Sequence, residues 1–461
     1  MMTPARWWMA VAAMCLLAFG YFEYLAINQW MTGRWYLTDV GNIQYVMVNS
    51  WHGDFLYSPF NPGNFFASHF SPILLLISPI IWLSKYPIPL ITLYCLALAL
   101  TPVPLYVLAR QRGLPAVVGL ALGFWFLGNH FTGSLLLSNH FESFYVLGFL
   151  TVMALYGIPR RRGLFWLAVV LTLAVKEDAA LWLLAFAVWK WVFERRDPAP
   201  PNRALRLAAL CVAWGLVAGG TIMLMAAAQP DAGNASFYLE RMGGMSLAAD
   251  NLSVLGLLVL SAGGLCLLHW RAALLLLVPL PVILGNFPFT RHLLYYYSYP
   301  FLPFLAFATV CGAAALHGWL ARRPGLAHRG GAAIATLLVI IGAVQWALPT
   351  RTDGLRRVPH KVTHRDNLRR QIAASDVVQP PLAVQSGLWG VTPWKPGTVW
   401  LSERHLTDEH YVFMDLKGMH GLGGEEFIRV FEKLREQMES GARTTLLDQH
   451  DFIVLSPVNP D

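Results

Sequence analysis

The sequence predicts an all-α polytopic membrane protein that carries a small soluble α/β domain at its C-terminus. About 56% of the 461 residues are apolar and only 13% are charged, whereas a soluble globular protein carries roughly 25% charged residues. The apolar residues form runs of about twenty, the length that crosses a hydrocarbon core about 30 Å thick. From about Pro349 onward the chain becomes charged, as expected of a domain outside the bilayer.

The first part of the chain, residues 1–348, is predicted to be helical because backbone groups inside lipid must be satisfied internally. Clusters of basic residues follow particular apolar runs: Arg6; Arg110 and Arg112; Arg160, Arg161 and Arg162; Arg195, Arg196, Arg203 and Arg206; Arg271; Arg322, Arg323 and Arg329. The positive-inside rule places such clusters on the cytoplasmic side. Orientation therefore explains the formal charge of +8, and no nucleic acid partner is predicted.

About eleven transmembrane helices fit between these clusters, near 8–28, 88–109, 115–137, 141–158, 163–175, 179–194, 206–228, 252–268, 272–286, 293–316 and 331–348. The N-terminus is then cytoplasmic and the C-terminal domain extracytoplasmic, in the cell inner (cytoplasmic) membrane. No small-residue cleavage site precedes Tyr36, so the first run is interpreted as a retained span rather than a signal peptide. Residues 71–83 are too short to span comfortably and are predicted to form an interfacial helix within the first outer loop, residues 29–87.

The C-terminal part, residues 349–461, has the patterns of a soluble α/β domain. Residues 382–385 and 452–455 are predicted strands, and residues 425–439 form an amphipathic helix with Phe427, Val430, Phe431 and Leu434 on one face. The five cysteines all lie in apolar runs, without the spacing of a metal site or disulfide framework, so they are predicted to be packing residues. The chain has no Gly-rich phosphate loop for nucleotide hydrolysis.

With this topology, the extracytoplasmic loops contain a second group of ionisable residues. They include Asp39, Asp54, His52, His69, His130, His140, Glu142, Lys176, Glu177, Asp178, Arg291 and His292. Any such loop must be polar, which is the simplest explanation for a single residue. That explanation is weaker for Lys176, Glu177 and Asp178, since three consecutive ionisable groups between two apolar helices are costly unless they are paired or solvated.

Asp39 is the candidate catalytic residue of the first outer loop. It is followed by Trp51-His52-Gly53 and by His69-Phe70-Ser71-Pro72. A carboxylate held over the membrane surface can act as a general base when a hydroxyl acceptor comes within about 3 Å. The structural alternative is that Asp39 caps a helix beginning at Val40.

His140 and Glu142 follow the third predicted span. Residues two apart do not share a helix face, so metal binding by this pair requires a turn or a further ligand such as Asp39 or His69. A metal site is therefore left unassigned. The alternative is a solvated helix start capped by Ser138 or Asn139.

Arg291 and His292 precede Tyr295 and Tyr296 and are candidate ligands of a phosphate. Arg binds phosphate in a bidentate manner, and aromatic rings at the interface can lie along a prenyl chain or a sugar face. An ordinary aromatic belt is the alternative for the tyrosines. Lys176 is a second candidate phosphate ligand, with Glu177 and Asp178 holding it or binding a divalent cation.

These segments resemble the family called domain of unknown function 2079, a set of prokaryotic membrane proteins placed within the GT-C glycosyltransferase superfamily. The matching pieces are Asp39-Val40-Gly41, Trp51-His52-Gly53-Asp54-Phe55-Leu56-Tyr57, His69-Phe70-Ser71-Pro72-Ile73-Leu74-Leu75, His140-Phe141-Glu142, Val175-Lys176-Glu177-Asp178-Ala179 and Arg291-His292-Leu293-Leu294-Tyr295-Tyr296. They cover about the first three quarters of the chain.

The resemblance implies a GT-C-like arrangement of the helices and an inverting transfer of a sugar from a polyprenyl-phosphate donor. The acceptor, whether glycan, lipid or protein, is not specified. By position, Asp39 corresponds to the catalytic base of GT-C enzymes and Lys176 to a ligand of the donor phosphate. GT-C enzymes often have two adjacent acidic residues in this loop, whereas Val40 follows Asp39.

Two other functions are compatible with the sequence. A transporter or flippase of a lipid-linked substrate predicts ionisable residues within spans and broken helices. A non-catalytic envelope assembly protein predicts that Asp39 is dispensable.

Overall fold

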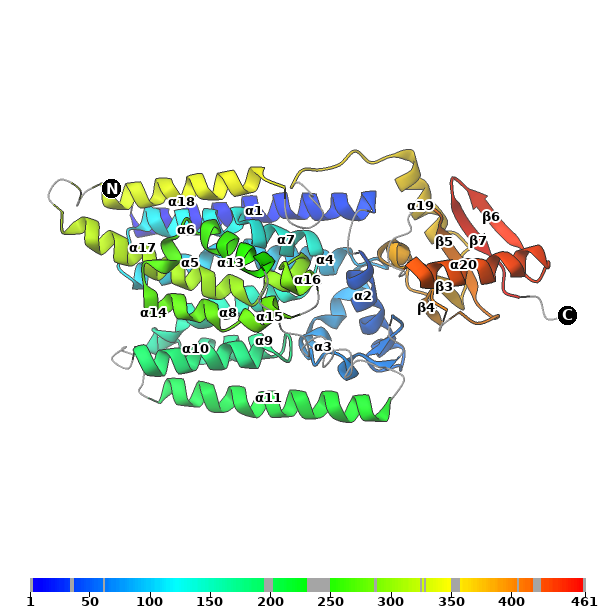
Figure 1. The fold of residues 1–461 in the computed structure, drawn as a ribbon, viewed down its shortest axis with the longest axis horizontal. Coiled ribbons are helices and arrows are strands. Elements are labelled where there is room, and N and C mark those ends of the chain that lie inside the picture. The colour runs from blue at the N-terminus through cyan, green and yellow to red at the C-terminus, as the bar shows by residue number, and fades with distance from the viewer. Residues whose placement is uncertain are drawn as a thin grey trace.

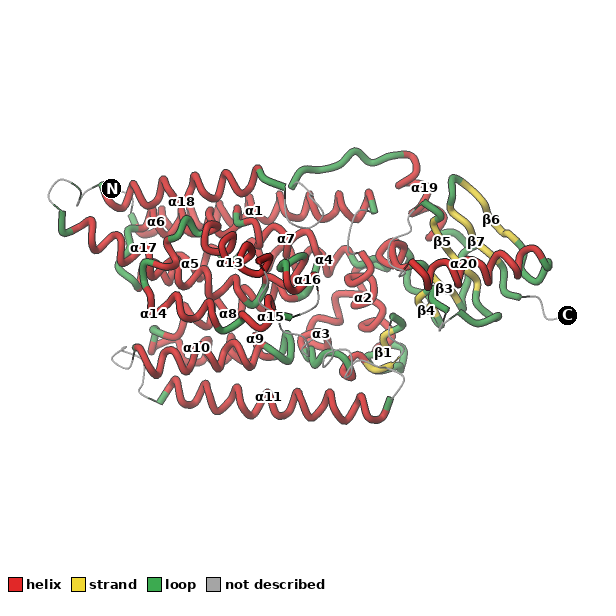
Figure 2. The backbone as a smooth tube through the Cα atoms, viewed as in Figure 1, coloured by secondary structure: helices red, strands yellow, loops and turns green. Residues whose placement is uncertain are grey.

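The computed structural model describes residues 3–33, 37–60, 63–194, 202–229, 249–285, 288–323, 326, 329–349, 357–403, 406–417 and 424–458. Most of these residues lie in an elongated helical bundle, with a small sheet beyond one end of it (Figure 1). Figure 2 shows that the strands are confined to this C-terminal part, apart from a short hairpin beside α2.

Five helical segments of the described residues are long and apolar enough to cross a membrane. They are α1 (Pro4–Thr32), α4 with α5 (Ile88–Ala99 and Pro102–Gln111), α11 (Arg203–Ala228), η7 with α17 (Tyr295–Ser298 and Phe301–Ala321) and α18 (Gly330–Ala347). The bent pair α6 (Ala116–Gly128) and α7 (His130–Ser138) makes a sixth candidate.

The other helices are shorter. They are α2 (Leu37–Trp51), α3 (Ile73–Ile77), α8 (Glu142–Tyr156), α9 (Arg162–Leu173), α10 (Ala179–Phe193), α13 (Ala249–Ser261), α14 (Trp270–Ala273), α15 (Leu280–Leu284) and α16 (Pro288–Arg291). A 15-residue helix such as α8 is about 22 Å long, less than the hydrocarbon thickness. The predicted count of eleven spans is therefore not confirmed, whereas five or six spans are supported by length and composition.

One predicted span and the predicted interfacial helix are each divided into shorter elements. The predicted helix 272–286 is divided into α14, a 3-10 turn (Leu274–Leu277) and α15, with Pro279 and Pro281 at the break. Proline removes a backbone donor and clashes with the preceding turn. The predicted interfacial segment 71–83 is present as α3 followed by a 3-10 helix (Ser78–Leu83).

The predicted span 115–137 bends by 52° between α6 and α7, at Asn129. This break frees carbonyl groups at the end of α6, which would be costly to bury alone. The buried guanidinium of Arg357 donates to the carbonyls of Gly128 and Asn129, both at 2.9 Å, and lies 4.9 Å from the Trp346 ring. A side chain from beyond the last span therefore stabilises a broken helix in the bundle.

Replacing Arg357 by Met should lower the stability of the folded chain by about 3 kcal/mol, because several buried carbonyls then lose a charged donor at once. Unfolding of the purified protein in detergent would measure the loss. Arg323→Met is the matched control, since Arg323 is exposed and lies against Trp319. Equal stability of the two variants would contradict the proposed stabilising role.

The C-terminal part contains a five-stranded mixed sheet with the order β4-β3-β5-β7-β6. The strands are β3 (Leu382–Val384), β4 (Thr398–Trp400), β5 (Tyr411–Asp415), β6 (Thr445–Gln449) and β7 (Phe452–Leu455), with helices α19 (His364–Ala374) and α20 (Gly424–Glu439). β3 is parallel to β4 and β5, whereas β7 is antiparallel to β5 and β6. The two strands and the helix predicted from the sequence are confirmed within one residue.

The C-terminal part packs directly on α2. The ring of Tyr45 lies edge-on to Trp389 with centroids 4.7 Å apart, and its hydroxyl donates to the carbonyl of Pro393 at 3.0 Å. The indole of Trp394 donates to Asn49 at 2.8 Å. Gly41 lies so close to the backbone of Trp389 and Gly390 that an added Cβ would meet it at 2.9 Å. The position of α2 is therefore fixed by residues about 350 positions later in the chain.

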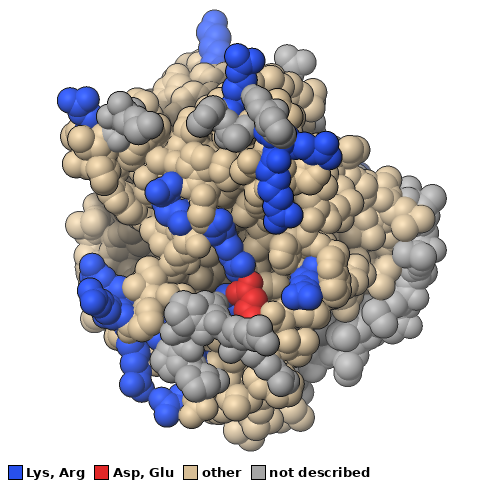
Figure 3. Space-filling model, turned by 90° about the vertical axis from the view of Figure 1, so that its left-hand side faces the viewer, with Lys and Arg blue, Asp and Glu red and all other residues tan. Residues whose placement is uncertain are grey.

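Basic residues gather at the end of the bundle where α1 begins, here called the basic end. Figure 3 shows Lys and Arg side chains spread over this face. Within it, Arg112 pairs with Glu194 at 2.6 Å, and Arg203 donates to the carbonyl of Tyr156. The segregation of basic loops predicted from the sequence is therefore present, although Arg195 and Arg196 lie outside the described residues.

Candidate functional site

Seven ionisable residues meet near the end of the bundle that faces the C-terminal part. We call them the titratable cluster: Asp39, His69, His140, Glu142, Lys176, Glu177 and Asp178. They come from α2, the loop before α3, the turn between α7 and α8, and the connection between α9 and α10. All seven were predicted as candidate site residues from the sequence.

A left-handed residue creates the turn that presents His140 and Glu142. Asn139 ends α7 with φ 48°, and α8 begins only three residues later at Glu142. Asparagine tolerates this backbone conformation better than most residues. The turn brings Nδ1 of His140 against a carboxylate oxygen of Glu142, which residues two apart on one helix could not achieve.

Glu142 is the centre of the cluster. Its side chain is fully buried, and its second oxygen accepts a hydrogen bond from Nζ of Lys176 at 2.8 Å. A buried carboxylate is tolerated only when it is paired and hydrogen-bonded. The predicted alternative of a solvated helix start at this position is wrong, because His140 and Glu142 are both buried.

Lys176 is enclosed by aromatic rings as well as by Glu142. Its Nζ lies 5.2 Å from the ring centroid of Tyr299 and 5.5 Å from that of Tyr296. The Tyr296 ring also stacks on His140, with centroids 3.9 Å apart and planes 15° apart. Tyr296 is therefore part of the site rather than of a lipid-facing belt.

Glu177 and Asp178 form hydrogen bonds that link neighbouring segments to the connection between α9 and α10. Glu177 accepts hydrogen bonds from Nδ1 of His69 and from the backbone N–H of Phe70, both at 3.1 Å. Burial raises the pKa of Glu177, but the charge and hydrogen bond of His69 and the charge of Lys176 outweigh it, so the net shift is downward. Asp178 accepts a hydrogen bond from the hydroxyl of Tyr299, and burial raises its pKa.

Asp39 lies at the accessible edge of the cluster, in the first turn of α2. Its carboxylate is 4.0 Å from Nε2 of His140 and keeps 30% of its exposure. Burial raises the pKa of Asp39 to about 6, although the charges of His69 and Lys176 act in the opposite direction. The helix begins at Leu37, so Asp39 does not cap a helix starting at Val40.

His140 is held as a neutral ring. Burial is the main cause that lowers its pKa well below 6.5, and the nearby charges of Lys176 and His69 add to it. Nδ1 of His140 contacts Glu142 and Nε2 faces Asp39, so a proton on Nδ1 would be donated to Glu142. Of the two groups, Asp39 has the pKa better matched to proton abstraction near neutral pH.

The structure places the remaining predicted site residues outside the titratable cluster. His52 stacks on Trp394 with centroids 4.4 Å apart, so it contacts the C-terminal part. Tyr295 is buried with φ 56°, a backbone conformation rare for an aromatic residue. Arg291 ends α16 and donates to the carbonyl of Gly285 at 3.4 Å, with His292 directly after it. Both stay predicted phosphate ligands.

Two residues of this region, Tyr299 and Arg357, were not predicted as site residues from the sequence. Tyr299 belongs to a run of aromatic residues that is typical of any membrane interface, and Arg357 is one of many arginines near the C-terminal part. For the metal left unassigned, the described residues contain no group of three or more His, Cys, Asp or Glu side chains placed to hold an ion.

Comparison with known proteins relates the chain to one family. A family model described as "Predicted membrane protein (DUF2079)" matches residues 39–377, which include the whole titratable cluster. No curated protein and no solved structure matches the chain.

Proposed function

Since this chain belongs to the DUF2079 family of predicted membrane proteins, we propose that it is a membrane glycosyltransferase that uses a polyprenyl-phosphate sugar donor. The observation that carries the proposal is Asp39, a partly exposed carboxylate with a pKa of about 6 at the edge of a buried titratable cluster. The proposal includes about eleven spans in a GT-C-like arrangement, several of them short. It also places the protein in the inner membrane, with the cluster and the C-terminal domain extracytoplasmic.

The proposed reaction is an inverting displacement at the anomeric carbon of the sugar. The acceptor hydroxyl oxygen bonds to this carbon while its proton passes to Asp39. The bond from carbon to the phosphate oxygen breaks, and the lipid phosphate leaves with the electron pair. The main demand on the protein is to activate the hydroxyl and to stabilise the negative charge that develops on the phosphate.

In this proposal Lys176 has a different role from Arg291 and His292. Lys176 is mostly buried and bonded to Glu142, so in this proposal it sets the charge around Asp39 and His140. Arg291 and His292 are half-buried rather than enclosed, so they are better placed to meet a charged lipid phosphate. In this proposal Arg291 and His292 bind the leaving phosphate, and Lys176 contributes its positive charge from within the titratable cluster.

A transporter is the second candidate, because the bend between α6 and α7 is the kind of broken helix used by transporters to bind ions. In such proteins the freed carbonyls face the transported ion. Here the guanidinium of Arg357 occupies the carbonyls of Gly128 and Asn129. Because Arg357 already binds these carbonyls, the break has a structural role. This contact supports sugar transfer rather than transport as the function.

The test uses the full chain purified into lipid nanodiscs and incubated with a panel of radiolabelled polyprenyl-phosphate sugars. We expect release of the unlabelled lipid phosphate together with a labelled product, in wild type but not in Asp39→Asn. The result that would overturn the proposal has two parts. No donor of the panel is turned over, and the same protein moves labelled lipid across the membrane of proteoliposomes. The transporter would then be the better interpretation.

Replacing Gly41 by Ala tests whether the C-terminal part positions α2. The new Cβ would meet the backbone of Trp389 and Gly390 at 2.9 Å, and Asp39 lies only two residues away. A displacement of about 1 Å can cost on the order of a hundredfold in rate, so the transfer rate should fall by tenfold or more. Gly20→Ala is the control, because nothing lies within 4 Å of its added Cβ. Equal rates in the two variants would show that α2 is not held in this way.

A further inference from the structure

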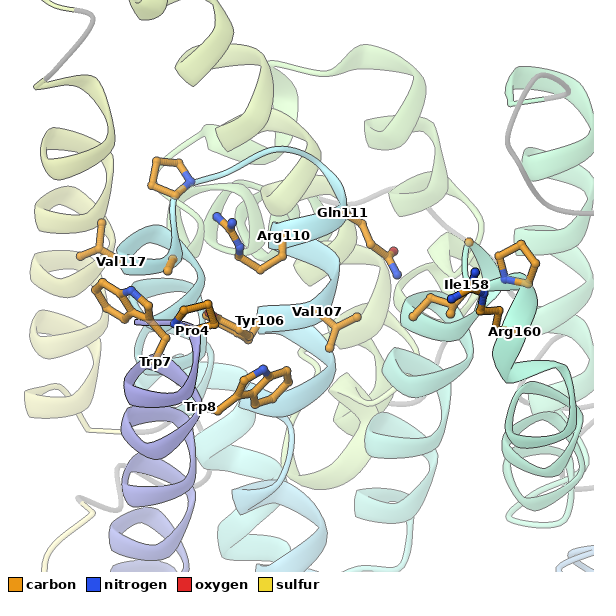
Figure 4. A pocket seen from close by; sticks show the side chains of 14 residues that line it. Pro4, Trp7, Trp8, Tyr106, Val107, Arg110, Gln111, Val117, Ile158 and Arg160 are labelled. Carbon is orange, nitrogen blue, oxygen red and sulfur yellow. The ribbon is translucent and has the colours of Figure 1, made fainter. Parts of the chain in front are cut away.

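The basic end contains a large open cavity, at the other end of the bundle from the titratable cluster. It has a volume of about 1110 Å³ and is lined by 14 residues of α1, α5, the start of α6 and the turn after α8 (Figure 4). Pockets for small molecules usually have volumes of about 300–1,000 Å³. A ligand larger than a typical small metabolite therefore fits this space.

The lining changes from apolar to basic over one helical turn. Trp8, Tyr106 and Val107 form the deeper wall, and the Trp8 ring lies edge-on to Tyr106 with centroids 5.0 Å apart. One turn later along α5 the lining residues are Arg110 and Gln111 (Figure 4). An amphiphile with an anionic head and an apolar tail matches this order.

The residues that line the cavity carry a net positive charge. Arg110 and Arg160 both line it with exposed side chains, and none of its lining residues is acidic. Arg110 gives one bond to the carbonyl of Leu114, out of five donors that a guanidinium carries. The nearby carboxylate of Glu194 is already paired with Arg112 and Lys190. The cavity therefore favours an anion at its rim.

The cavity lies beside a candidate membrane span, and this position indicates that the anion is part of a lipid. Its first wall is the beginning of α1, a candidate membrane span, and tryptophans such as Trp7 and Trp8 are enriched at membrane–water interfaces. Basic pockets between membrane helices on the cytoplasmic side recognise lipid head groups. We propose that this cavity binds one anionic phospholipid of the bilayer, with its head group at the rim that carries Arg110 and Arg160 and its acyl chains along Trp8, Tyr106 and Val107.

The test does not depend on the proposed transfer reaction, because it measures lipid retention. The full chain is released from nanodiscs containing equal amounts of phosphatidylglycerol and phosphatidylcholine, and native mass spectrometry counts the lipids that stay bound. One retained phosphatidylglycerol is expected in wild type. Each arginine near a bilayer contributes about 1 kcal/mol to anionic lipid binding, so the Arg110→Gln/Arg160→Gln variant should bind about 30-fold more weakly.

The matched control is Arg322→Gln/Arg323→Gln, which removes the same charge from exposed residues that do not line the cavity. Retention lost equally in both double variants would overturn the proposal in favour of general attraction to the bilayer. Equal retention of phosphatidylcholine would show an apolar groove without head-group selection. Displacement by inorganic phosphate alone would identify a site for a soluble anion instead.

Discussion

Replacing Asp39 by Asn should lower the rate of sugar transfer by at least about 100-fold, because general-base catalysis typically contributes between 10² and 10⁴. The amide has nearly the same shape, and the carboxylate keeps 30% of its exposure, so folding should be unchanged. The measurement is the initial rate with the best donor of the panel, alongside the unfolding midpoint in detergent.

The pH dependence of wild type gives a second readout of the same group. Burial raises the pKa of Asp39 from 3.8 to about 6, so the base form is lost as the pH falls through about 6. Below that value the rate should fall about tenfold per pH unit, and above it the rate should level off. A residual rate in Asp39→Asn should lack this step.

Asp54→Asn is the matched control for Asp39, because Asp54 lies in the same loop region and is exposed. Its transfer rate should stay within about twofold of wild type, as expected for a solvated carboxylate without a role in the reaction. Full activity of Asp39→Asn, or an equal loss in both variants, would remove Asp39 from the mechanism.

Glu142→Gln should be the most destabilising change within the titratable cluster. The substitution leaves the ammonium group of Lys176 buried without its carboxylate partner, and breaking a buried pair in this way typically costs about 3–5 kcal/mol. Denaturant unfolding in detergent would measure the loss. The exposed pair of Arg429 and Glu403 supplies the control, since Glu403→Gln should cost at most about 1 kcal/mol.

A double variant tests whether the lost stability comes from the pair of Glu142 and Lys176 or from general disruption of the core. Glu142→Gln combined with Lys176→Met removes both charges, so much of the lost stability should return, with a coupling free energy of about 2 kcal/mol. If the double variant is less stable by the sum of the two single losses, Lys176 and Glu142 do not stabilise each other.

The sequence predicted the helical character of the bundle, the small C-terminal sheet and the membership of the cluster. The two predictions about the fold succeeded because they rest on local properties, namely apolar runs and strand patterns. The predicted count of eleven spans is not confirmed, because α8, α9 and α10 end after 12–15 residues. Composition does not reveal where a helix stops inside a packed bundle.

The sequence could not predict which residues of the cluster pair with one another, for a different reason. The contact of Lys176 with Glu142 spans 34 residues, and that of Asp178 with Tyr299 spans 121. Such contacts depend on how the helices pack, which a local pattern does not contain. The roles of Glu142 as the central partner and of Arg357 at the helix break needed the arrangement in space.

Arg357 also sets an order of events during biosynthesis. It is synthesised 229 residues after Gly128, whose carbonyl it binds, and translation adds about 5–20 residues per second, so the delay is on the order of ten to forty-five seconds. During that time the bend between α6 and α7 lacks its arginine, and water or a straighter helix must satisfy these carbonyls. The bundle is therefore completed at this point only after its last span has left the ribosome, and a nascent chain ending before residue 357 would remain open there.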